Sequence, residues 1–180
     1  MGWLDWLRGA DEAETEASGS DTVRKIAAEL DALPPDRARF VACFAYVLGR
    51  VAYADHQISP EETRAMERLV AEVGRLPEQQ AVLVVEMAKS QNRLFGGTEN
   101  FLVTRELRGL VAADDRAALL DALLAISAAD DTISAVEESQ LRQIASELGF
   151  THAELVAARS RWSDKRSVIR SLRRRPVGPG

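Results

Sequence analysis

Several residue types are rare in this sequence, and their scarcity excludes several classes of protein. Cys43 is the single cysteine, which excludes an intrachain disulfide or a thiolate metal cluster and is typical of a reducing compartment. Glycine (11 residues), proline (6) and aromatic residues (6%) are scarce, which argues against a β-sandwich or a barrel. The chain also lacks a secretion leader and any run near the roughly 20 apolar residues that span a bilayer. We therefore expect a cytoplasmic protein.

An excess of positive charge is missing as well. The formal net charge is −5, so no global basic field attracts nucleic acid, and we expect none as a partner. The basic residues that are present gather near the C-terminus. They could contact anionic lipid, nucleic acid or an acidic protein, and a solvated tail is the alternative. This basic group consists of Lys165, Arg166, Arg170, Arg173, Arg174 and Arg175.

Catalytic patterns are also absent. The two histidines, His56 and His152, have no Ser/His/Asp or Cys/His arrangement around them in the sequence. Phe95-Gly96-Gly97 has neither the spacing nor the preceding strand of a phosphate-binding loop. We therefore expect no enzyme and no small-molecule substrate.

Alanine, leucine, glutamate and arginine are abundant, and this usage favours helices. With 180 residues, 46% of them hydrophobic, the chain should form a single all-α domain of about seven to eight helices. Apolar residues recur at helical spacing, and 36–54 should be a core helix in which Cys43 is buried. Gly74 and Gly149 should stop helices. The expected helices are 21–33, 36–54, 59–73, 77–90, 98–110, one on each side of the turn at Asp130, 152–162 and 164–172, with a connection at 91–97.

The ends of the chain differ in composition from its middle. Trp3, Leu4, Trp6 and Leu7 form a short apolar patch, followed by a stretch of small and acidic residues. The patch could dock on the domain, on a partner or on lipid, or it could fray. We expect a disordered tether at 1–20, a helical domain at 21–162, and a basic helix and tail at 163–180.

One pattern, Asp-x-x-Ile-Ser-x-x-Glu, occurs twice. Asp130 follows Asp55 by 75 positions, and Glu137 follows Glu62 by the same interval, without a gap. This shared register predicts an internal duplication with pseudo-two-fold symmetry.

Most of the repeated pattern has a structural explanation. Serine followed three residues later by glutamate is a capping box, which begins a helix, and Pro60 suits the first helical position. Capping leaves Asp55 and Asp130 unexplained, because each follows the end of a helix, where negative charge is unfavourable. Each aspartate could accept amides in an Asx-turn or bind a cation.

A calcium loop of the EF-hand type is excluded, because the first half of its ligand set is missing from both copies. A composite divalent-metal site remains as an alternative to simple capping if the two turns converge. Its ligands would be Asp55, His56, Glu62, Asp130, Asp131 and Glu137.

The chain resembles the TerB-like family of bacterial tellurite-resistance proteins, which includes the N-terminal domain of DjlA-type co-chaperones. The resemblance lies in Val51-Ala52-Tyr53-Ala54-Asp55 with Ile58 and Glu62, and in Ala128-Ala129-Asp130 with Ile133 and Glu137. It implies a duplicated all-helical fold, a link to stress or metal-oxyanion resistance, and an acidic surface that binds metal. His56 and Asp131 replace the glycine of the family's usual Ala-Asp-Gly turn, so the turn must accommodate a side chain.

Three functional hypotheses follow. The first is a non-enzymatic binding or adaptor module that holds a protein partner. The second is a divalent-metal sensor or buffer that uses the acidic turns. The third is a peripheral membrane scaffold, held by Trp3, Trp6 and the basic tail.

Overall fold

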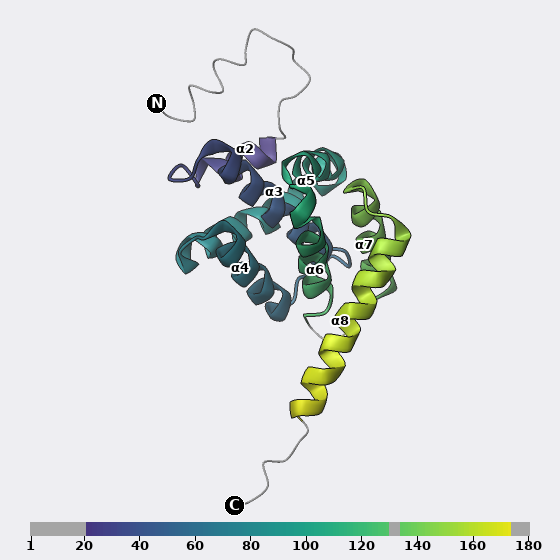
Figure 1. The fold of residues 1–180 in the computed structure, drawn as a ribbon. Helices are drawn as coiled ribbons and strands as arrows, with labels where there is room; N and C mark the ends of the chain where they lie inside the picture. Colours follow the sequence, from purple (N-terminus) through teal and green to yellow (C-terminus); the bar gives the residue numbers. More distant parts are fainter. Residues whose placement is uncertain (1–20, 130–133, 174–180) are drawn as a thin grey trace, which may run out of the picture.

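The computed structural model describes residues 21–129 and 134–173, with side chains up to Ser163. Within these ranges the chain forms seven α-helices and one 3-10 helix, and no strand, which confirms the all-α prediction (Figure 1). The predicted tether at 1–20 and the last residues of the predicted tail, 174–180, lie outside the described residues. The elements are α2 (Asp21–Ala28), α3 (Pro35–Ala52), α4 (Pro60–Gly74), α5 (Glu78–Leu110), η1 (Ala113–Asp115), α6 (Arg116–Ser127), α7 (Ala135–Glu147) and α8 (His152–Arg173).

Helix α3 is the core of the fold, as its apolar stripe predicts. Every residue from Val41 to Ala52 is buried, and the helix packs against α2, α4, α5, α6 and α7. Cys43 is fully buried, and this burial, together with the charge of Glu106, raises the pKa of its thiol. The cysteine is therefore a core residue.

Helix α5 runs without interruption for 33 residues, so the predicted connection at 91–97 and the helix start at Thr98 are wrong. A helical glycine costs only about 0.5–1 kcal/mol relative to alanine. Contacts on both sides of Gly96-Gly97 offset that cost. Before the glycines, the buried Asn92 side chain donates to the Tyr46 carbonyl oxygen at 3.0 Å, and after them Val103 is fully buried.

Helix α8 is likewise one helix, where the sequence predicted a break near Ser163. Serine and aspartate lower helix propensity by only a few tenths of a kcal/mol, which does not stop a helix. The predicted start at His152 is confirmed, and the C-terminal turns of α8 extend past the other helices (Figure 1). Among the described residues, none of the helices combines the length and apolarity that crossing a membrane requires.

Two glycines at helix ends have different functions. Gly149 has φ +85°, which confirms it as the residue that stops α7. At the end of α4 the left-handed residue is Arg75, with φ 53°, whereas Gly74 belongs to the last helical turn. A Cβ atom on Gly74 would lie 2.9 Å from Cγ of Leu76, so this glycine allows close packing.

The helix bounds around the two turns keep the interval seen in the sequence. Helix α3 ends at Ala52 and α4 begins at Pro60, while α6 ends at Ser127 and α7 begins at Ala135. Both the ends and the starts therefore differ by 75 positions. The helices flanking the turns are in the same register, and duplication of the whole half-domain stays a prediction.

Candidate functional site

The first turn holds a histidine in a conformation that favours glycine. His56 has φ 66°, its amide donates to the Tyr53 carbonyl oxygen at 3.0 Å, and its ring meets the Tyr53 ring edge-on at 5.3 Å. The Asp55 carboxylate accepts the Gln57 amide at 2.9 Å, which is the Asx-turn named above as the structural alternative. The turn therefore accommodates the imidazole side chain at position 56.

Both predicted capping boxes are present. Glu62 accepts the Ser59 amide at 2.7 Å, while the Ser59 hydroxyl accepts the Glu62 amide at 3.1 Å. The corresponding distances for Ser134 and Glu137 are 2.6 and 3.1 Å. Both glutamates are buried, so each carboxylate is fixed at the start of its helix.

A third capping box starts α8 and was missed in the sequence. Glu154 accepts the Thr151 amide at 2.6 Å, and the Thr151 hydroxyl accepts the Glu154 amide at 3.2 Å. The Thr-x-x-Glu spacing of Thr151 and Glu154 is present in the sequence and is sufficient to identify such a box.

The metal prediction names six residues, and four of them are described. Asp130 and Asp131 lie outside the described residues. Among the described residues no group of three His, Cys, Asp or Glu side chains is arranged to hold a metal ion. Asp55 and His56 lie in the first turn, and Glu62 and Glu137 each hold an N-cap amide. The six-ligand site stays a prediction.

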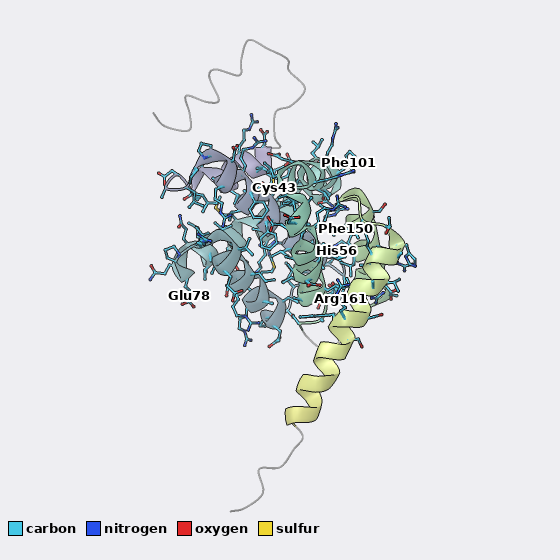
Figure 2. The ribbon with its side chains drawn as sticks, viewed as in Figure 1. Cys43, His56, Glu78, Phe101, Phe150 and Arg161 are labelled. Atoms are coloured by element: carbon cyan, nitrogen blue, oxygen red, sulfur yellow. The ribbon has the colours of Figure 1, made fainter. Side chains whose placement is uncertain are left out.

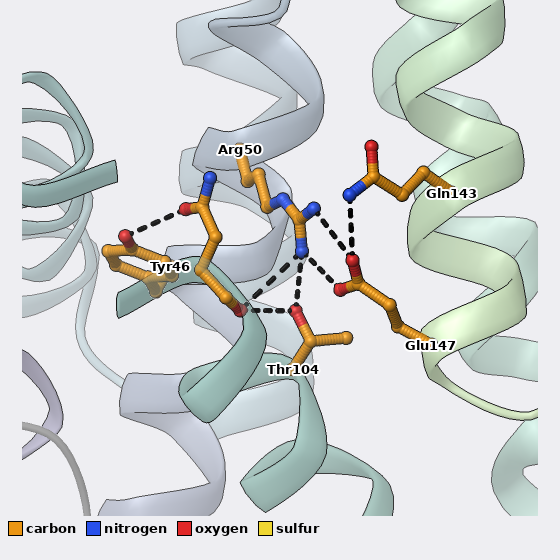
Figure 3. Close-up of polar contacts among 6 residues, drawn as sticks. Tyr46, Arg50, Thr104, Gln143 and Glu147 are labelled. Carbon is orange, nitrogen blue, oxygen red and sulfur yellow. Dashed lines mark hydrogen bonds and ion pairs between the residues drawn. The ribbon is translucent and has the colours of Figure 1, made fainter. Parts of the chain in front are cut away.

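A buried ion pair lies close to the first turn and was not predicted from the sequence. The guanidinium of Arg50, on α3, donates through Nη1 and Nη2 to the two carboxylate oxygens of Glu147, on α7, at 2.5 and 3.1 Å (Figure 3). Arg50 is 4% exposed. Such a bidentate pair fixes both the distance and the angle between its side chains.

The ion pair belongs to a larger network that also includes α5. Arg50 Nη1 donates to the Thr104 hydroxyl at 2.9 Å, and that hydroxyl donates to the Asn100 carbonyl oxygen at 2.8 Å. The Asn100 side chain accepts from the Tyr46 hydroxyl at 2.9 Å (Figure 3). Burial and the charge of Glu99 raise the pKa of Tyr46 to about 12, which keeps this phenol a donor. The network therefore joins α3, α5 and α7.

Burial and hydrogen bonding act on Glu147 in opposite directions. Burial raises the pKa of its carboxyl, but hydrogen bonds from Arg50 and Gln143 outweigh burial and hold the pKa below its ordinary value. The Gln143 bond to Glu147 is 3.0 Å long. The carboxylate is therefore charged at neutral pH. Within the described residues, Arg50 Nε is buried with no hydrogen-bond partner.

A cavity of about 330 Å³ lies between the first turn and the middle of α5. Its described lining is rich in arginine, amide and imidazole groups, and none of the lining residues described is an aspartate or a glutamate. These residues are Arg50, Tyr53, Ala54, His56, Asn92, Arg93, Leu94, Gly96, Gly97, Asn100 and Gln140.

A larger hollow of about 920 Å³ lies beside α4, α6 and α8. Leu69 and Trp162 contribute apolar surface, whereas its charged residues carry both signs, and Arg64 pairs with Glu61 at 3.0 Å. Its charges are mostly exposed and partly matched to one another. The described charged residues of the smaller cavity are both arginines, so it is better suited to select an anionic ligand.

Arg50, Asn100 and Glu147 were missed because their partners are distant in the sequence. One signal was present: Arg50 is the only charged residue in the otherwise apolar run from Val47 to Ala52. An arginine placed inside a core helix requires a buried partner. The sequence offers no such signal for the identity of that partner.

Comparison with known proteins adds one match. Residues 40–160 match the family model described as tellurite resistance protein TerB, which spans more than half of the chain. This range contains both capped turns, the Arg50–Glu147 pair and every described residue of the cavity lining. No curated protein and no solved structure matches the chain.

Proposed function

The chain belongs to the TerB family of tellurite resistance proteins, and we propose that it is a cytoplasmic, non-enzymatic module that binds a small oxyanion in the 330 Å³ cavity. The observation that carries this proposal is the lining. None of its eleven described residues is acidic, although acidic residues outnumber lysine and arginine by 28 to 23 in the whole chain. A site without carboxylates avoids repulsion of an anion.

The donors that remain for a ligand can be identified from the hydrogen bonds. Both amide hydrogens of Asn92 are committed, to the carbonyl oxygens of Tyr46 and Ala88. Asn100 accepts through its oxygen, which leaves its amide nitrogen as a donor. Together with Gln140 and the exposed Arg93, this amide could surround an anion with hydrogen-bond donors.

Charge also favours Arg93 as the principal ligand group. The Arg50 charge is already matched by Glu147, whereas Arg93 lies at the rim of the cavity with a guanidinium that suits the oxygens of an oxyanion. Arg50 then supports the site by fixing α3 against α5. The family description, which concerns resistance to tellurite, makes tellurite the first probe.

Calorimetric titration with tellurite, selenite, sulfate and phosphate tests the proposal. Arg93→Gln should weaken tellurite binding about tenfold or more, because a hydrogen bond to a charged group contributes about 1.5–3 kcal/mol. Arg68→Gln, an exposed arginine of the other hollow, is the matched control and should bind as the unmodified chain does. Absence of binding by every oxyanion, or equal binding by both variants, would contradict the proposal.

The adaptor hypothesis adds a protein partner to this module. An affinity pull-down with the full chain in the presence of a chelator separates an adaptor from the alternative, a divalent-metal sensor. An adaptor retains its partner without metal, whereas a sensor releases it. Binding of the basic tail to anionic vesicles is a third proposal, tested by truncation after Ser163 and by its decrease with salt.

A further inference from the structure

Helix α5 carries an apolar face that remains exposed among the described residues. Leu94, Phe95, Phe101 and Leu102 are exposed by 67, 40, 58 and 51%. Leu94 and Phe101 are seven residues apart, as are Phe95 and Leu102, so the four side chains lie along one side of the helix over two turns. We call these four residues the α5 apolar face. Phe101 lies at the margin of the molecule (Figure 2).

This face is separate from the side of α5 that packs in the core. Val84, Val85, Ala88, Val103 and Leu107 are fully buried. A surface helix needs a single apolar side, and four large exposed apolar residues within nine positions mark an interaction surface. Something outside the described residues should therefore cover the face.

The N-terminal part of the chain enters the fold beside this face. At the start of α2, the Thr22 amide donates to the Glu99 carboxylate and the Thr22 hydroxyl donates to the Gln91 side chain, both at 3.2 Å. One turn later, Lys25 Nζ lies 5.4 Å from the centroid of the Phe95 ring. Gln91, Phe95 and Glu99 lie on successive turns of α5, so α2 begins beside the edge of the α5 apolar face.

The segment that precedes α2 has the composition of a ligand for such a face. It contains Trp3, Leu4, Trp6 and Leu7, of which Trp3, Leu4 and Leu7 have the spacing of one side of a helix. Residues 9–20 then include four acids and no base. Lys25 and the exposed Arg105 lie near the two ends of the face and match that charge.

We propose that residues 3–7 dock on the α5 apolar face of the same molecule. A flexible linker of twelve residues has a root-mean-square length of about 17–21 Å. The face is about 12 Å long, from eight steps of 1.5 Å. The linker therefore reaches every part of it. So short a tether provides an effective concentration of about 1 mM, which favours the intramolecular contact over a second copy of the chain.

Docking of residues 3–7 on the α5 apolar face would place them next to the 330 Å³ cavity, but it does not require a ligand there. Leu94, Gly96 and Gly97 belong to the lining of the 330 Å³ cavity, and Leu94 also belongs to the α5 apolar face. A segment docked on Leu94 therefore lies at the edge of the cavity. The docking depends on the exposure of the α5 apolar face, the position of α2 beside it and the length of the linker, so it does not require that an oxyanion binds.

Tryptophan fluorescence of the full chain tests the docking. The chain has three tryptophans, so Trp162→Phe leaves Trp3 and Trp6 as the reporters. Their emission should lie at shorter wavelength than that of a free indole, and acrylamide should quench it several-fold less. Phe101→Ser/Leu102→Ser should reverse both effects. Val82→Ser/Leu83→Ser, which changes exposed residues of α5 outside the face, is the matched control and should reverse neither.

Several outcomes would overturn the proposal. The first is emission typical of exposed indoles in the full chain, and the second is an identical response of both double variants. A shift that disappears on dilution would indicate docking on a second copy of the chain. A shift that occurs only with anionic phosphatidylserine vesicles would indicate docking on lipid. If Trp162→Phe does not fold, the difference between the full chain and Trp3→Phe/Trp6→Phe supplies the same spectrum. Tellurite binding is measured separately, so failure of the docking leaves the proposed function intact.

Discussion

The first capped turn and the Arg50–Glu147 network use similar chemical groups in opposite ways. In the turn, side chains bond to backbone amides two or three residues away, as Asp55 does with Gln57 and Ser59 does with Glu62. In the network, Arg50 bonds to groups 54 and 97 residues away. The turn organises one short segment, whereas the network fixes three helices relative to one another.

This difference determines what each region loses when one group is removed. Removing a capping serine leaves behind one neutral amide at a part-buried helix start, a loss that typically costs about 1 kcal/mol. Removing the Glu147 carboxylate would leave the buried Arg50 guanidinium without its counter-charge, in a place that water reaches poorly. The turn should therefore be tolerant and the network sensitive, and the following changes can sharpen or break that contrast.

Glu147→Ala should have the largest effect. Leaving Arg50 buried without its counter-charge should lower the free energy of unfolding by about 3–5 kcal/mol. Urea denaturation measures this loss. Glu86→Ala removes an exposed partner of Lys89 and should change stability by no more than about 1 kcal/mol. Similar losses in the two variants would remove the contrast between the regions.

Ser59→Ala and Ser134→Ala should each have a moderate effect. Loss of the N-cap should lower the free energy of unfolding by about 1 kcal/mol in each variant. The two capping boxes have the same hydrogen bonds, so the two losses should agree. A loss at either serine as large as that of Glu147→Ala would show that the turn has more than a local function.

His56→Gly should have a smaller effect of opposite sign. Glycine relieves the left-handed conformation at this position, and the expected gain is about 1 kcal/mol, reduced by the lost contact with Tyr53. The midpoint of thermal unfolding reports this change. Arg75→Gly, at the other left-handed position, is the control for the backbone effect alone. A loss of stability at position 56 alone would show that the Tyr53 contact outweighs the relief of strain.

The pH dependence of the free energy of unfolding should also depend on the network, and the expected effect of Glu147→Gln on it is smaller. The folded pKa of Glu147 is below its ordinary value, so its contribution is fully present above the unfolded pKa and is lost as the pH falls through the folded pKa. As the pH is lowered, the free energy of unfolding should decrease less steeply for Glu147→Gln than for the unmodified chain. Equal slopes would mean that this carboxylate is not linked to folding.

The smallest effect concerns divalent cations at the turns. The six-residue hypothesis predicts binding heat with calcium, magnesium, manganese or zinc that disappears in Asp55→Ala/Asp130→Ala. Asp114→Ala/Asp115→Ala is a control with the same change in charge, at η1. If no ion gives heat above buffer, or if the first variant retains that heat, the metal hypothesis is wrong.

Local features were predictable and long-range ones were not. The capping boxes depend on a spacing of three residues, and the core position of α3 depends on its apolar period, so both could be read directly. The network and the cavity depend on which helices meet. Arg50 showed that a partner was needed, but Glu147, Thr104 and Asn100 have nothing in their own neighbourhoods to identify them.

The two wrong helix boundaries have related causes. Gly96-Gly97 and Ser163-Asp164 lower local helix propensity, and the sequence interpretation ended helices there. The penalty of about 1 kcal/mol per glycine is small beside the packing of residues on both sides. In α5, Asn92 and Thr104 are each fixed by α3, so the glycines between them remain helical.

The continuity of α5 has a consequence for changes in chain length. Each residue added to a helix rotates everything that follows by about 100°. Asn92 and Thr104 bond to Tyr46 and Arg50 on the same neighbouring helix, so the twelve-residue interval between them is fixed. Within this interval, α5 should accept substitutions at exposed positions but no insertion or deletion of a single residue. A loop at Gly96-Gly97 would have accepted both.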